Sequence, residues 1–155
     1  SPTVAVTLEA WVYPTATAGT RTIFHKGPAG GASNYALKLN SGVLAAVVNN
    51  VNLTTTISVQ TNRWSHVAFT YNSNNGNYFF YLNGSKVSSG VVSAGGIPNG
   101  SDDLYFGSNG TGQFFQGLLD EMRIANYVKP EYQINRFLQH SDFRVRCRFQ
   151  REFRI

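Results

Sequence analysis

The stretch RWSHVAFTY, residues 63–71, decides how this chain folds. Successive side chains of a β-strand point to opposite sides, so this stretch forms two rows of residues. One row holds Trp64, His66, Ala68 and Thr70, and the other holds Ser65, Val67, Phe69 and Tyr71. An apolar residue at every second position predicts a strand with Phe69 in a dry core.

The residues that follow predict further antiparallel strands. The turn NSNNG at 72–76 leads into NYFFYLNGSKV at 77–87, where Asn83-Gly84 is a typical two-residue hairpin turn. The return strand is expected to end near Val87, because residues 88–100 are rich in Gly and Ser and predict a loop. Two more strands are expected in DDLYFGS and FFQGLLDEMRI, separated by a turn at 109–112.

The residues before the decisive stretch show the same pattern. Strands are predicted in VAVTLEAWVY (4–13), RTIFHKG (21–27), NYALKLN (34–40), VLAAVVNN (43–50) and VNLTTTISV (51–59). A helix is predicted only after Pro130, in EYQINRFLQ. The fold class is therefore all-β, an antiparallel β-sandwich of the jelly-roll kind with one short C-terminal helix.

The charge is distributed unevenly along the chain. Of the net charge of +5, residues 141–155 supply +3, from five Arg against Asp142 and Glu152, which leaves +2 for residues 1–140. The nearly neutral body carries no groove-reading motif, so we expect no nucleic-acid partner. No apolar run reaches the roughly 18 residues that a membrane helix needs, so we expect no membrane insertion.

Residues 141–155 form a tail to the domain of residues 1–140. Arg or Gln alternates there with an apolar row, which predicts an appended C-terminal β-strand; the apolar row is Phe143, Val145, Cys147 and Phe149. This row is our candidate for strand pairing, either within the molecule or by a strand swap that makes a homo-oligomer. A fusion scar or an out-of-frame translation would give the same composition.

The sequence does not indicate an enzyme. A glycosidase needs two carboxylates facing one cleft, and the eight acidic residues are scattered. The three histidines form no cluster, and a single cysteine excludes a disulfide framework. We therefore expect no catalytic residues.

Seven segments in order resemble the LamG-like family of laminin G-like, concanavalin A-like jelly rolls. They are LEAWVYP, IFHKG, YALKLN, RWSHVAFTY, FYLNGSKV, LYFGSNG and FQGLLDEMRI, within Leu8 to Leu138. The resemblance implies a non-catalytic recognition module for carbohydrate, glycoconjugate or protein ligands, on an extracellular or cell-surface protein. The alternatives are a structural or adhesion spacer, or a recombined fragment that oligomerises by strand exchange. Family members usually begin with one more strand beside the closing strand, and the tail is our candidate to replace it.

The resemblance also implies candidate sites. Asp120 matches the position where such sandwiches place a structural calcium ligand, and Asp102 and Asp103 are candidates for a second site; an ion-paired rim acid and an ordinary turn are the alternatives. Sugar binding would use aromatic rings and amides. The candidates for ligand binding are Asn34, Tyr35, Asn72, Asn74, Tyr78 and Asn109, although strand aromatics more often lie in the core and loop asparagines more often form turns.

Overall fold

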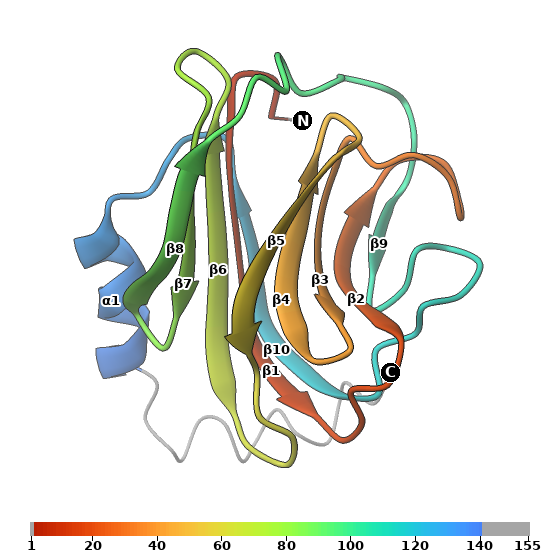
Figure 1. The fold of residues 1–155 in the computed structure, drawn as a ribbon, viewed down its shortest axis with the longest axis vertical. Coiled ribbons are helices and arrows are strands. Elements are labelled where there is room, and N and C mark those ends of the chain that lie inside the picture. The colour runs from red at the N-terminus through yellow and green to blue at the C-terminus, as the bar shows by residue number, and fades with distance from the viewer. Residues whose placement is uncertain (1, 141–155) are drawn as a thin grey trace.

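Residues 2–140 fold into two antiparallel five-stranded sheets packed face to face (Figure 1). This computed structural model describes residues 2–140. Sheet A has the strand order β10-β1-β6-β7-β8, and sheet B has the order β5-β4-β3-β2-β9. The all-β sandwich predicted from the sequence is thus confirmed.

The strands of sheet A are β1 (Ala5–Pro14), β6 (Ser65–Asn72), β7 (Asn77–Leu82), β8 (Ser85–Val91) and β10 (Gly117–Ala125). Those of sheet B are β2 (Thr20–Lys26), β3 (Tyr35–Asn40), β4 (Val43–Val48), β5 (Val51–Ser58) and β9 (Leu104–Phe106). The helix α1 (Glu131–His140) follows Pro130 as expected. No helix among the described residues has the length and apolar character that crossing a membrane requires.

The core lies between the inner faces of the two sheets. Phe69 of β6 and Phe80 of β7 are fully buried, and their ring centroids lie 4.9 Å apart. From the opposite sheet, Leu37 and Leu39 belong to the same buried cluster. The period-two pattern therefore keeps these aromatic rings dry, as predicted.

One strand boundary differs from the prediction. β8 continues to Val91 instead of ending near Val87, because Ser88 and Ser89 still pair with β7. Gly90 also fits the sheet, since a Cβ atom there would lie 2.5 Å from the hydroxyl oxygen of Tyr78. The small residues that indicated a loop therefore let the strand pass beside a tyrosine ring.

The outer face of sheet A is covered. Ile134 of α1 is fully buried against Ala68 and Tyr81. The segment before the helix is fixed on β1 by Thr7, whose hydroxyl donates to the Tyr127 carbonyl at 2.6 Å. The same hydroxyl oxygen accepts the Lys129 amide at 3.0 Å.

This cover brings an ion pair into the protein interior. Glu9 of β1 is 1% exposed, and its Oε2 contacts the ammonium of Lys129. Its Oε1 lies 4.0 Å from Nε2 of His66. A buried carboxylate is tolerated only with such partners, because removing a charge from water is costly.

The closing strand β10 lies at an edge of sheet A, as the sequence led us to expect. It pairs with β1, and no other strand of residues 2–140 pairs with it. The tail that was predicted to occupy such an edge, residues 141–155, lies outside the described residues. Its strand, its pairing through Phe143, Val145, Cys147 and Phe149, and an oligomer built on it stay predictions.

Replacing Lys129 by Met should lower the free energy of unfolding by about 3–5 kcal/mol, because it leaves the Glu9 carboxylate buried without its cation. The double variant Glu9→Leu with Lys129→Met should recover most of this loss, since no uncompensated charge remains. Urea unfolding of both variants measures the two effects. A loss below about 1 kcal/mol in the single variant would contradict this account of the ion pair.

Candidate functional site

The outer face of sheet B is hollowed. The hollow encloses about 180 Å³ and is lined by Thr22, His25, Gly30, Gly31, Ser33, Ala36, Lys38, Val47, Asn50, Asn52, Asn109 and Gln113. We call it the sheet B hollow. Its lining comes from four strands and from the loops on either side of them.

The strand register explains how these residues come together. On β3, Leu37 and Leu39 point into the core, so Ala36 and Lys38, which alternate with them, point outward. Ala36 is paired with Val47 on β4, and the two form the floor of the hollow.

Further residues of the hollow continue the same rows of side chains. Val47 is paired with Asn52 of β5, and Ala36 is paired with His25 of β2. Lys38 in turn is paired with Thr22 of β2. The hollow is thus a direct product of the sheet register.

His25 holds one wall in place. Its side chain is buried, and Nε2 lies 3.1 Å from the Pro28 carbonyl oxygen. Because a carbonyl can only accept, Nε2 carries a proton, and Nδ1 lies 3.1 Å from the Ser33 hydroxyl oxygen. Both ring nitrogens are therefore occupied in shaping the loop of residues 27–34.

A second wall comes from the loop of residues 107–116, which is tied to the first. The Gly30 amide donates to the Asn109 carbonyl at 2.7 Å. Gly30 has a φ of +67°, and a Cβ atom there would lie 2.4 Å from Oγ1 of Thr111, so only glycine fits without displacement.

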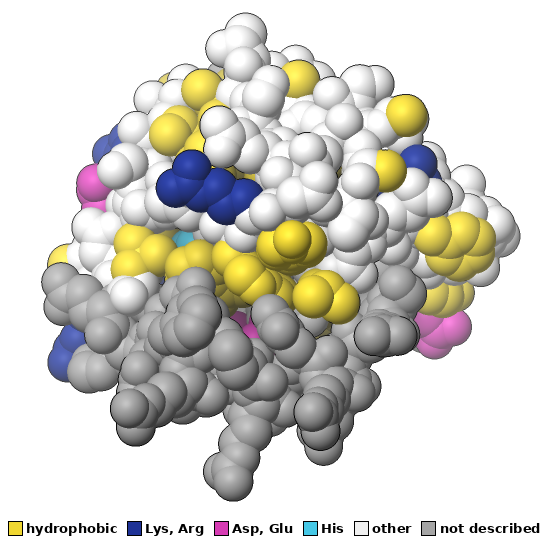
Figure 2. Space-filling view, turned by 90° about the horizontal axis from the view of Figure 1, so that it is seen from below, with side chains coloured by type: hydrophobic (Ala, Val, Ile, Leu, Met, Phe, Trp, Pro, Cys, Tyr) yellow, Lys and Arg dark blue, Asp and Glu magenta, His cyan; other side chains and the backbone are white. Residues whose placement is uncertain are grey.

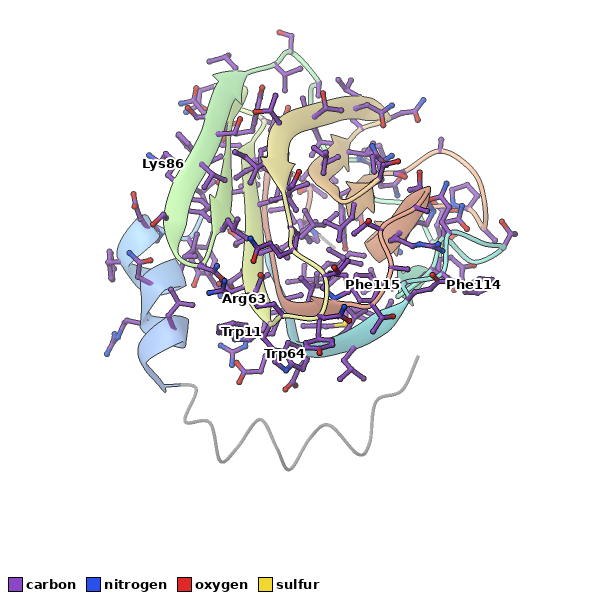
Figure 3. All side chains as sticks on the ribbon, turned by 60° about the horizontal axis from the view of Figure 1, so that its bottom comes forward. Trp11, Arg63, Trp64, Lys86, Phe114 and Phe115 are labelled. Atoms are coloured by element: carbon purple, nitrogen blue, oxygen red, sulfur yellow. The ribbon has the colours of Figure 1, made fainter. Side chains whose placement is uncertain are left out.

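The base of the second loop is fixed in the core. Phe115 is 2% exposed, whereas its neighbour Phe114 is 59% exposed at the side of the molecule away from α1 (Figure 3). Near this base, the amide and hydroxyl of Thr22 donate to the Gln113 carbonyl and to Oε1 at 2.9 and 3.0 Å. Both walls thus rest on the rigid sheet.

Of the six predicted ligand residues, Asn109 alone lines the sheet B hollow. Tyr35 packs in the core and offers no exposed ring face. Asn34 is buried and donates to Oδ2 of Asp102 at 3.5 Å. Asn72 and Asn74 form the β6–β7 turn on sheet A, and Tyr78 packs partly buried against the core.

Most of the hollow was not predicted from the sequence. The alternation in YALKLN does place Lys38 on the other face of its strand from Leu37 and Leu39, and this pattern predicts that Lys38 points away from the core. The partners of Lys38 across the sheet depend on strand register, however, and the Gly30–Asn109 contact joins residues from two distant loops. Neither can be read from one segment of sequence.

A second surface lies at the lower end of the molecule. Figure 2 shows a band of apolar side chains there. Trp11 and Trp64 lie together at this end (Figure 3), and the Trp64 ring meets that of Tyr13 with centroids 5.6 Å apart. The sheet B hollow, whose lining belongs to residues 22–113, is the better-defined site.

Comparison with known proteins agrees with the architecture. A profile described as "Concanavalin A-like lectin/glucanases superfamily" matches residues 1–135. The chain belongs to this superfamily. The LamG-like resemblance is thereby confirmed. No curated protein matches the sequence.

Three solved structures are similar to this chain. The first is a Bacteroides ovatus protein assigned provisionally to carbohydrate binding, with a TM-score of 0.73, 24% identity and coverage of 85% of this chain and 40% of that chain. The second is a heptameric SAP-like pentraxin from Limulus polyphemus, with a TM-score of 0.73, 19% identity and coverage of 92% of this chain and 74% of that chain. The third is the CBM40 of a Ruminococcus gnavus IT-sialidase, with a TM-score of 0.71, 16% identity and coverage of 87% of this chain and 83% of that chain. At these identities the likeness shows the fold alone, and this chain spans two fifths of the Bacteroides protein.

The side chains predicted to bind calcium have other partners in the structure. Within the described part of the chain, no three His, Cys, Asp or Glu side chains form a group that could hold a metal ion. Oδ1 of Asp120 already accepts the Glu121 amide at 2.7 Å. At the second candidate, the Lys26 ammonium contacts the Asp102 carbonyl, and Oδ2 of Asp103 accepts the Tyr105 hydroxyl at 3.4 Å. A cation at Asp102 would be repelled by Lys26, so calcium stays a prediction, with Asp120 as its better candidate.

Replacing His25 by Leu should loosen the first wall, because the Pro28 carbonyl and Ser33 hydroxyl lose their shared partner. Two hydrogen bonds contribute about 1–3 kcal/mol, so the amides of Gly30 and Gly31 should exchange roughly tenfold faster or more. Hydrogen exchange measures this, with the exposed-turn variant Asn74→Ala as the control. Unchanged exchange at both glycines would show that His25 does not hold the loop.

Proposed function

We propose that this chain is a non-catalytic carbohydrate-binding module whose sugar sits in the sheet B hollow. The observation that carries the proposal is the lining, which is polar and presents amide, hydroxyl and ammonium groups above a floor of Ala36 and Val47. Sugar hydroxyls need such closely spaced donors and acceptors, and a concave site removes part of the ligand from water.

The rigidity of the hollow supports binding. Thr22, His25, Lys38 and Asn52 come from neighbouring strands, so little conformational entropy is lost when a ligand orders them. The walls are preformed by the His25 hydrogen bonds and by the contact of Gly30 with Asn109.

The chemistry of the lining favours binding over catalysis. None of the residues that line the hollow is Asp or Glu. Hydrolysis of a glycosidic bond by the usual route requires two carboxyl groups flanking the sugar. A sugar held in this hollow would meet donors that orient it and no acid that cleaves it.

Structures with the same fold point in the same direction. The Bacteroides ovatus protein is assigned to carbohydrate binding, and the CBM40 comes from a sialidase. We extend this to an extracellular or cell-surface location, where glycans are displayed. A protein ligand, or a spacer without any small ligand, is the alternative function that the experiment below separates.

A glycan array should therefore detect binding, and Asn52→Phe should abolish it. Asn52 is exposed on β5 and lines the hollow, so a phenyl ring there would occupy the space of the sugar. Titration calorimetry with the best glycan should show at least a tenfold weaker affinity, about 1.4 kcal/mol.

The matched control is Thr56→Phe, which places the same ring at another exposed position of β5, outside the hollow. It should bind as the unmodified protein does. Absence of any glycan binding, or equal loss of binding in both variants, would contradict a sugar site in this hollow.

A further inference from the structure

The charge of Lys38 is unbalanced within the sheet B hollow. Among residues 2–140, no other Lys, Arg, Asp or Glu lines the hollow. Its ammonium is half-buried and donates to Oδ1 of Asn52 at 3.2 Å. Among the described residues, no carboxylate lies within ion-pair distance of it.

Three other cations of residues 2–140 have a carboxylate or an aromatic ring as partner, while Arg21, Lys26 and Arg63 donate to neutral oxygens as Lys38 does. Lys129 contacts the Glu9 carboxylate, and Arg123 lies 3.3 Å from Glu121. Lys86 lies 4.4 Å above the ring of Phe79 (its place on β8 is marked in Figure 3). Lys38 has only an amide oxygen, although burial lowers the pKa of its ammonium and so disfavours its charged form. An anion bound next to Lys38 would stabilise the charged form of the ammonium, which burial destabilises.

The neighbouring amides are oriented so that they also favour an anion. Oδ1 of Asn109, a residue that lines the hollow, accepts the Gly112 amide at 2.8 Å, so its NH2 group takes no part in that bond. Oδ1 of Asn52 is likewise used by Lys38. Because backbone N–H and ammonium groups can only donate, these orientations are fixed by chemistry. The groups left for a ligand are mainly donors.

We propose that the glycan bound in the sheet B hollow carries an anionic group, a carboxylate or a sulfate, held by the ammonium of Lys38. This inference rests on the proposed function and adds the chemical class of the ligand. Charge-assisted hydrogen bonds from Lys38 would recognise either anion, and the NH2 group of Asn52, whose Oδ1 accepts from Lys38, is a further donor at this point. Neutral sugars would leave the lysine without a counter-charge.

The experiment compares neutral glycans with their sialylated, uronate-containing and sulfated counterparts on one array. Acidic glycans should dominate the binders, and titration should show at least a tenfold gain over the neutral counterpart. The carboxylate and sulfate arms distinguish the two sources of the anion.

Two variants of Lys38 test its part directly. Lys38→Gln should lose the gain for the acidic glycan, while Lys38→Arg should keep much of it because the positive charge remains. Binding of the acidic glycan should also weaken as the pH rises through the lowered pKa of Lys38, since only the ammonium holds the anion. His25 is the other titratable group of the lining, and the pH series with Lys38→Gln serves as its control.

The outcomes separate the two claims. Neutral glycans that bind as tightly as acidic ones, or a Lys38→Gln variant that keeps the full preference, would overturn the anionic ligand and leave the proposed function standing. Failure of every glycan, neutral and acidic, would overturn the proposed function together with this inference.

Discussion

The dry layer between the two sheets is the constraint on which the rest of this structure depends. Each fully buried Leu or Phe contributes on the order of 1.5–3 kcal/mol, and Phe69, Phe80, Leu37 and Leu39 all lie in that layer. Because side chains alternate along a strand, fixing Leu37 and Leu39 inward also fixes Lys38 outward. The core therefore determines the position of the functional side chains as well as the fold.

Each outer face carries a charged side chain that is partly or fully removed from water, and the two charges have different partners. On sheet A the chain covers its own outer face with α1 and the segment before it, and the buried Glu9 carboxylate is matched by Lys129. On sheet B no helix of residues 2–140 covers the outer face, and the partly buried Lys38 donates to the amide oxygen of Asn52. The protein satisfies the first charge itself, and we propose that a ligand satisfies the second.

The sequence predicted the elements well because local patterns encode them. Alternation gave the strands, Asn83-Gly84 marked the hairpin, and Pro130 marked the start of α1. The candidate site was harder to predict, since it depends on register and on a contact between distant loops. Tyr35 is instructive: it shares a face with Leu37 and Leu39, so alternation alone already favoured the core over a ligand site.

Backbone amide chemical-shift mapping of the isotope-labelled protein tests most directly whether the outer face of sheet B is the recognition surface. During titration with the tightest glycan, the account predicts shifts that centre on the amides of Ser33, Lys38, Asn52 and Asn109, with those of sheet A nearly unchanged. Shifts centred on the lower apolar end near Trp11 and Trp64, or on the β6–β7 turn, would contradict it.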